Sequence, residues 1–451
     1  MTAPPRLPGT PQGESPADRA LSLSLAVEID PALRWATALL KSEPAAPLGL
    51  VVVSRLLSAA GRREVAIEGL EVAVHRAIDA GNLPLAVVAA CDLRTLGHDP
   101  AAHLDDIAAA FCHGSPRSLG KHGAPPDLPR SVEAFQPLPA ALSGKALVAK
   151  AQEAVHEARE LLERELAEQT SPPKVALPPL FGSLGRVDLR AMLDVFETKT
   201  VGAGNVLIEE GTPGAEAYIL ARGEVEVRRN TEKDESLLLA RLGSGALFGE
   251  MALLSRAPRA ASVIAARPSI ILVARKDALD TIAASQPEVA QVFADHCRRR
   301  MVENLVRTSS ILSAVKPNER PALVERFVTR TYEDGDVLIH QGGTSEGLHL
   351  IASGEVAVMH HDGADTTLIA KLGVGEVVGE VALVLRRPST AHVIAACPTV
   401  TLHLPRDRFL ELIKEHPAIL GELYELAIKR DEETSSIVAQ EAADADDFVL
   451  V

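Results

Sequence analysis

Hydrophobic positions follow a helical period through the first quarter of the chain. Between residues 18 and 112, long Ala, Leu and Val stretches are interrupted by glycines where a helix needs a C-terminal stop. These glycines are Gly61, Gly81 and Gly97. The pattern predicts five or six helices. Residues 46–80 and 82–112 each have roughly the 34-residue length of a helix–turn–helix repeat, so a tetratricopeptide-like array and an irregular bundle are the two alternatives.

The segments around this helical domain are rich in proline and glycine. Residues 1–17 are predicted to be a disordered tail, and residues 113–142, with six prolines, a linker that builds neither helix nor sheet. Residues 143–179 are predicted to contain a connecting helix over Lys145–Glu168, followed by a proline-rich stretch. One apolar stripe on this helix is expected to pack on the following domain, with a coiled-coil dimer as the alternative.

From residue 180 onward the hydrophobic period changes from helix to strand. Val225 and Val227 alternate with Glu224, Glu226 and Arg228, which is typical of a half-buried strand. Several short strands with turns roughly every ten residues, flanked by helices, indicate a small antiparallel barrel.

Landmarks in this part of the chain recur at a fixed distance, so two copies of one domain are predicted, at residues 180–305 and 306–430. Four pairs of residues lie 131 positions apart: Phe196 and Phe327, Gly204 and Gly335, Gly211 and Gly342, and Gly223 and Gly354. After a one-residue gap, Glu250 and Glu380 are 130 apart. The predicted fold class is therefore α+β and multidomain: an N-terminal all-α domain followed by two small antiparallel β-barrels of the jelly-roll kind.

The C-terminal residues 431–451 form an acidic tail. They carry seven acidic side chains and no basic one. Because like charges repel along the segment, it is predicted to be disordered. The alternative is that its apolar end, Phe448–Val451, docks in a groove of the helical domain or of a partner.

Composition and charge exclude several classes of function. The net charge of −15 repels phosphate backbones, which argues against nucleic-acid binding. No apolar run approaches the roughly 18 residues of a membrane span, and the first 20 residues do not resemble a signal peptide, so a cytoplasmic protein without membrane contact is expected. The four cysteines are far apart and no His-x-His pair occurs, so no metal site is predicted.

One segment of the first barrel carries the residues of a ligand site. It reads FGEMALLSRAPRAASV, from Phe248 to Val263. Gly249 allows the backbone to approach a ligand, and Glu250 offers a carboxylate that can accept hydrogen bonds from sugar hydroxyls. Residues from Met251 suit a short helical turn whose N–H groups point at an anion, and Arg259 adds a planar cation suited to phosphate oxygens. We interpret this segment as part of a pocket for a sugar phosphate.

This segment resembles the phosphate-binding cassette of the cyclic nucleotide-binding domain family, which includes regulatory subunits of cyclic-AMP-dependent protein kinase and the catabolite activator protein. The shared pattern is FGE, Ala-Leu and Pro-Arg-Ala-Ala, with nine positions from Glu250 to Arg259. The resemblance implies that Glu250 binds the ribose 2′-hydroxyl, that Arg259 binds the exocyclic phosphate, and that the amides of Ala252 and Ala260 also bind the phosphate. It favours cyclic AMP over cyclic GMP, because Ala260 stands where a threonine favours guanine in the family.

The second copy departs from this pattern. Its segment VGEVALVLRRPSTAHV, from Val378 to Val393, keeps Gly379 and Glu380 but has Ser389 at the position of Arg259. The second cassette is therefore predicted to be degenerate. Arg386 or Arg387 could compensate only by reaching back, and both are expected to lie on a solvated turn.

These observations favour a non-enzymatic sensor that binds cyclic AMP in the first barrel and signals through helix rearrangement to an unknown protein partner, which contacts the helical domain. The alternatives are a ligand-free tandem-barrel scaffold and an inhibitor resembling a kinase regulatory subunit. A ligand-gated transcription factor is disfavoured, because no helix-turn-helix fits after Arg430. The identity of the partner and the oligomeric state stay open at this stage.

Overall fold

The structure of the protein is a computed structural model, and it divides into two compact units. The described residues are 15–125, 135–230, 236–251, 258–308, 315–316, 323, 326–362 and 365–448. The first unit comprises Met1–Glu209, Ala215–Glu250 and Ala261–Phe293. The second unit comprises Glu210–Gly214, Met251–Ala260 and Ala294–Val451. Residues 1–14 of the predicted N-terminal tail, residues 231–235 and 363–364, and Ala252 lie outside the described residues.

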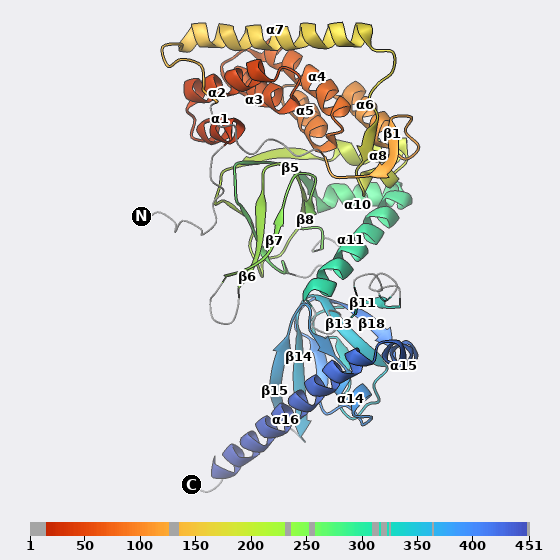
Figure 1. Ribbon diagram of the computed structural model, residues 1–451. Helices are drawn as coiled ribbons and strands as arrows, with labels where there is room; N and C mark the ends of the chain where they lie inside the picture. The colour runs from red at the N-terminus through yellow and green to blue at the C-terminus, as the bar shows by residue number, and fades with distance from the viewer. Residues whose placement is uncertain are drawn as a thin grey trace. The chain divides into compact units, whose positions relative to one another are not determined.

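Six helices form the N-terminal domain, all within the continuously described residues 15–111, as the sequence predicts (Figure 1). They are α1 (Pro16–Leu25), α2 (Ile29–Ser42), α3 (Pro47–Ala59), α4 (Arg63–Asp79), α5 (Leu83–Thr95) and α6 (Ala101–Phe111). Gly61, Gly81 and Gly97 follow α3, α4 and α5 with φ between 71° and 75°, the left-handed conformation that ends a helix. The predicted helix stops are confirmed, whereas the tetratricopeptide-like assignment stays a prediction.

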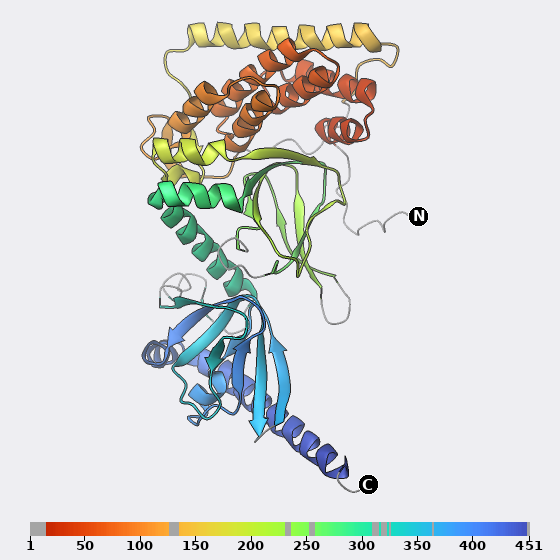
Figure 2. The same ribbon diagram turned by 180° about the vertical axis from the view of Figure 1, so that it is seen from behind.

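Helix α7 (Gly144–Glu168) lies across α2, α3 and α4, as both views show (Figures 1 and 2). Its stripe residues Leu147, Val155 and Ala158 are fully buried. A β-carbon at Gly69 of α4 would lie 3.2 Å from a methyl carbon of Val155, so the missing side chain lets the two helices approach closely.

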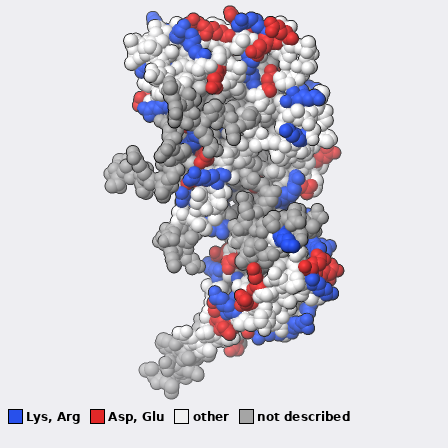
Figure 3. Space-filling view, viewed as in Figure 1, with Lys and Arg blue, Asp and Glu red and all other residues white. Residues whose placement is uncertain are grey.

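The expectation that α7 packs on the following domain is therefore wrong. The linker of about thirty residues lets the helix fold back onto the preceding one, where Gly69 provides the space. Because the stripe is buried within the same chain, it is not available for a coiled-coil dimer. The opposite face of α7 carries interspersed acidic and basic side chains (Figure 3), including the ion pairs Lys150–Glu153 and Arg159–Glu163.

The proline-rich linker contains a strand, which corrects the prediction that it builds neither helix nor sheet. Strand β1 (Ser118–His122) pairs in parallel with β2 (Val175–Leu177), and the amide of Val175 donates to the carbonyl of Arg117 at 2.7 Å. The pairing forms because β1 lies between Pro116 and Pro125 and contains no proline itself, so its backbone N–H groups are free to donate.

The first barrel consists of two four-stranded antiparallel sheets in its described residues, ordered β3-β10-β5-β8 and β4-β9-β6-β7. Its strands are β3 (Glu197–Val201), β4 (Val206–Ile208), β5 (Glu216–Arg222), β6 (Val225–Asn230), β7 (Ser236–Leu242), β8 (Leu247–Phe248), β9 (Ser262–Ala265) and β10 (Ser269–Arg275). Tyr218, Leu220, Val225 and Ile271 are buried between the sheets. The predicted jelly-roll barrel is confirmed.

The described residues of the second barrel repeat this topology strand for strand. The sheet orders are β11-β18-β13-β16 and β12-β17-β14-β15. The strands are β11 (Val328–Tyr332), β12 (Val337–Ile339), β13 (Gly347–Ser353), β14 (Val356–Asp362), β15 (Asp365–Leu372), β16 (Val377–Val378), β17 (His392–Ala395) and β18 (Thr399–Pro405). The internal duplication predicted from the 131-residue spacing is therefore a duplication of structure.

Side-chain hydrogen bonds join the helical domain to strand β3 of the first barrel. Arg55 of α3 pairs with Asp92 of α5 at 2.6 Å and donates to the hydroxyl of Thr200 at 2.9 Å. The hydroxyl of Thr198 donates to Asp92 at 3.1 Å. The arginine therefore contacts both a helix and a strand.

The other helices of the described residues flank the barrels. They are η1 (Phe181–Ser183), α8 (Arg186–Asp194), α10 (Lys276–Ser285), α11 (Pro287–Thr308), α14 (Glu380–Val384), α15 (Arg406–Glu415) and α16 (Pro417–Phe448). The predicted disorder of the acidic tail is wrong for residues 431–448, which belong to α16. Residues such as Ala, Glu and Gln favour helix in this segment, and its first residue, Asp431, pairs with Arg387. None of the described helices combines the length and apolar character that a membrane span requires.

Candidate functional site

The first cassette begins with a backbone turn that only glycine adopts easily. Strand β8 ends at Phe248, and Gly249 follows with a φ of 76°. Glu250 comes next, and only 3% of its surface is exposed. A buried carboxylate is stable only when it accepts hydrogen bonds, which suits it to bind vicinal sugar hydroxyls.

Arg259 is fixed by its own backbone. Its amide donates to the carbonyl of Thr212 at 2.9 Å, and its carbonyl accepts from the amide of Gly211 at 2.8 Å. The residue is only 8% exposed. These two hydrogen bonds hold the arginine beside the turn at 210–214.

Gly214 makes room for the guanidinium group of Arg259. A β-carbon at Gly214 would lie 2.1 Å from Nε and 2.3 Å from Cζ of the arginine, well inside van der Waals contact. Sequence analysis did not identify Gly214, although it lies 131 positions before Ser345 and differs from it in size. A buried planar cation in a defined orientation is suited to bind phosphate oxygens.

The other predicted residues of the first cassette have more varied environments. Met251 is half-buried and packs against a hydrophobic cluster that contains Leu402 and Phe409. Ala260 is exposed. Ala252, predicted to donate its amide to the phosphate, lies outside the described residues. The roles of these residues and of Gly249 and Glu250 in binding stay predictions.

Ser389 of the second barrel has the same backbone contacts as Arg259. Its amide donates to the carbonyl of Gly343 at 2.9 Å, and its carbonyl accepts from the amide of Gly342 at 2.8 Å. The side-chain hydroxyl donates to the carbonyl of Ala391 at 3.0 Å. The structure thus supports the alignment that places a serine where the first copy has an arginine.

Ser345 stands where the first copy has Gly214. Its hydroxyl donates to the carbonyl of Gly347 at 3.0 Å, and the residue is buried. The second copy therefore differs at both members of the contacting pair, since it has neither the arginine nor the glycine that makes room for it.

Both barrels match a known family. A profile of the Cyclic nucleotide-binding domain matches residues 198–286 and 329–416. The chain contains two cyclic nucleotide-binding domains. The family resemblance and the barrel fold predicted from the sequence are both confirmed.

Curated relatives of these two domains are kinase regulatory subunits. The chain is 29% identical over 237 residues to the cAMP-dependent protein kinase regulatory subunit of Blastocladiella emersonii, covering 52% of this chain and 56% of that protein. It is 31% identical over 224 residues to the cAMP-dependent protein kinase type II regulatory subunit of Drosophila melanogaster, covering 49% and 56%. The chain therefore spans little more than half the length of the curated relatives it matches.

Among solved structures, the regulatory domain of Toxoplasma gondii PKA with cAMP is similar. The identity is 26%, the match covers 55% of this chain and 92% of that one, and the TM-score is 0.28.

In the second cyclic nucleotide-binding domain, an arginine of the chain itself binds the cassette carboxylate. Glu380 is 2% exposed, and its Oε1 accepts from Nη1 of Arg430 in α16 at 2.7 Å. Arg430 also contacts Glu376. Arg386 and Arg387 are exposed on the turn after α14, as predicted, and Arg387 pairs with Asp431.

Proposed function

We propose that the protein is a non-enzymatic sensor of cyclic AMP, with a binding site in the first cyclic nucleotide-binding domain and a structural role for the second. The observation that carries the proposal is the buried contact of Arg259 with Gly214, which is replaced by Ser389 and Ser345 in the second domain. A buried phosphate is stable beside a fixed guanidinium, whereas beside a serine hydroxyl its charge is uncompensated.

Cyclic AMP is the proposed ligand for two reasons. The residue after Arg259 is Ala260, which has no hydroxyl to bond a guanine. The curated relatives are named as subunits of cAMP-dependent kinases. Cyclic GMP is the competing ligand in the test.

A chain of contacts within the first unit supports signalling from the first domain to the helical domain. Helix α10 follows β10 directly and contacts α8, and α8 contacts α6. Arg190 of α8 pairs with Asp105 of α6 at 3.1 Å. Ligand that stabilises one position of α10 would shift the population of α6 positions, and a partner bound to the helical domain would detect the shift.

Titration of the full chain with each nucleotide tests the proposal. We expect cyclic AMP to saturate near one molecule per chain, with a dissociation constant of roughly 1 μM, which is about −8 kcal/mol. Hydrogen–deuterium exchange at saturation should show protection in α10 and a change in α6. Calorimetry without heat from either nucleotide at high micromolar protein would favour the scaffold instead, and a stoichiometry near two would show that the second cassette binds.

A second prediction concerns the pair Arg259 and Gly214, whose residue types can be introduced at the equivalent positions of the second domain. The double variant Ser345→Gly, Ser389→Arg is expected to create a second nucleotide site, because it supplies both the cation and the space that the cation needs. The single variant Ser389→Arg is its control and should stay near one nucleotide per chain, since the Ser345 side chain still fills the space. If the single variant binds two molecules, Gly214 is not needed to place the arginine.

A kinase inhibitor is the second candidate function, and the names of the curated relatives favour it. Against it, residues 113–179 contain no Arg-Arg pair of the kind that occupies a kinase substrate site. Assay of a cAMP-dependent kinase catalytic subunit with increasing amounts of the chain distinguishes the two. Inhibition that cyclic AMP relieves would support the inhibitor, and unchanged kinase activity would support a different partner.

A further inference from the structure

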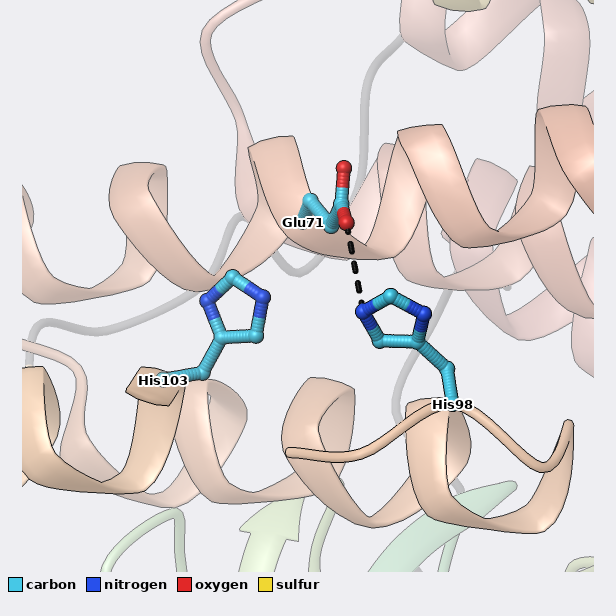
Figure 4. Close-up of side chains that lie close together, drawn as sticks. All are labelled: Glu71, His98 and His103. Atoms are coloured by element: carbon cyan, nitrogen blue, oxygen red, sulfur yellow. Dashed lines mark ion pairs between the residues drawn. The ribbon is translucent and has the colours of Figure 1, made fainter. Parts of the chain in front are cut away.

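Three metal-ligating side chains meet in the helical domain, away from both cassettes. Glu71 lies on α4, His98 in the turn after α5, and His103 in the first turn of α6. One ligand atom from each lies within 4.8 Å of the other two. Figure 4 shows the two imidazole rings side by side, both on the same side of the Glu71 carboxylate.

The distances within this cluster are close to those of a metal site. Nε2 of His98 lies 3.4 Å from Oε1 of Glu71. Ligand atoms around a tetrahedral zinc ion, with bonds of about 2.0–2.1 Å, are about 3.3–3.4 Å apart. The Glu71–His98 edge already has this length, so contraction is needed only toward His103, by side-chain rotation in the first turn of α6.

His103 contributes a nitrogen that the fold leaves unused. Its Nδ1 is buried and has no hydrogen-bond partner among the described residues. Buried polar atoms nearly always have a partner, so this nitrogen is a candidate to bind a ligand such as a metal ion.

His75 lies beside the cluster, one helical turn from Glu71 on α4. Its Nδ1 is 3.2 Å from the carbonyl oxygen of Glu71, and its ring meets that of His103 edge-on at 6.3 Å. With Nδ1 directed at this carbonyl, Nε2 is the ring nitrogen that can face a ligand. Two or three imidazoles with one carboxylate suit Zn²⁺ rather than the oxygen-preferring Mg²⁺ or Ca²⁺.

We propose that Glu71, His98 and His103 form a binding site for a divalent transition metal, with Zn²⁺ as its representative. The sequence predicted no metal site. These ligands were missed because they lie on three separate elements and form no short motif. A bound ion would join α4 to the α5–α6 hairpin. It would therefore restrain α6, the helix that is proposed to receive the nucleotide signal.

Zinc titration of the chelator-treated full chain tests this proposal. Glu71→Gln is the main variant, since it keeps the size of the side chain and a hydrogen-bond acceptor for His98 but removes the anionic ligand. His98→Ala is the second variant. We expect each to weaken the tightest zinc equivalent by at least about 100-fold, more than the loss of a supporting group outside the metal's own ligands. The control His113→Ala removes an exposed imidazole of the same region and should bind zinc as the native chain does.

Two further measurements separate this site from other histidines, because His340, His361 and His392 also lie close together. Cobalt(II) should give the visible absorption of a four-coordinate ion in the native chain and lose it in Glu71→Gln. Zinc should raise the melting temperature of the native chain but not of this variant. Equal zinc affinity and equal cobalt spectra in the native chain and both variants would overturn the proposal and leave Glu71–His98 as an ordinary ion pair.

Discussion

Arg259→Ala is expected to weaken cyclic AMP binding by about thirty-fold to several thousand-fold. The side chain is buried and its position is fixed by two backbone hydrogen bonds. In the variant the phosphate would therefore lose its charged partner, and water would not replace that partner at the buried position. Removing one partner of a buried, hydrogen-bonded charge pair costs about 2–5 kcal/mol. Calorimetric titration of the native and variant chains measures the difference directly.

Two further variants serve as comparisons in this experiment. Arg275→Ala removes an exposed arginine of the same domain, which pairs with Asp277 at 3.8 Å, and should leave the affinity unchanged. Arg259→Lys keeps the charge but not the planar fork, so an intermediate loss is expected. If Arg259→Ala binds as tightly as Arg275→Ala, the first cassette does not hold the nucleotide through this residue.

Asp18→Asn is expected to destabilise the first unit by about 3–5 kcal/mol. Asp18 caps α1 through a reciprocal pair of hydrogen bonds with Ser15, and its carboxylate also pairs with Arg222 and Arg267. Asp18 and Arg222 are almost completely buried. The amide would leave two arginines beside each other without an anion, and chemical denaturation measures the loss.

A matched control exists for this substitution. Asp277→Asn makes the same change in an exposed pair with Arg275 and should alter stability by no more than about 0.5 kcal/mol. Equal denaturation curves for Asp18→Asn and Asp277→Asn would mean that the buried network contributes nothing measurable.

The Asp18 network also predicts a dependence on pH. Burial on its own raises the pKa of this carboxyl, but the charges of Arg222 and Arg267 and their hydrogen bonds outweigh it, so the pKa lies below its usual value. A carboxyl with a lowered folded-state pKa stabilises the fold fully above its unfolded pKa of about 3.9. The contribution is lost as the pH falls through the folded-state pKa. In the Asp18→Asn variant this part of the acid sensitivity should be missing.

Features that repeat, or that need one special residue type, could be predicted from the sequence. The duplication followed from glycines and phenylalanines at constant spacing, and the helix ends followed from Gly61, Gly81 and Gly97, because left-handed backbone restricts the choice of residue. The cassette was found for the same reason, since its residue types and spacing are chemically demanding.

Features that depend on contacts between distant residues could not be predicted. The parallel pair of β1 and β2 joins segments that begin at residues 118 and 175, and neither segment shows a strong strand pattern. The packing of α7 depends on Gly69, whose role is visible only when Val155 lies against it. Gly214 was missed because its function is to leave space for Arg259, and an unfilled space has no signature along the chain.

The hydrogen bonds between the helical domain and β3 determine where the chain can be cut into working fragments. Cleavage within the linker at residues 113–142 would leave both pieces associated, since Asp18, Arg55 and Asp92 contact residues that lie after the linker in the chain. A fragment that starts at residue 180 would lack those partners, among them the Asp18 carboxylate that pairs with Arg222. Residues 113–142 are thus a connection inside one folding unit, and a fragment for nucleotide studies keeps its native packing only when it begins at or before Ser15.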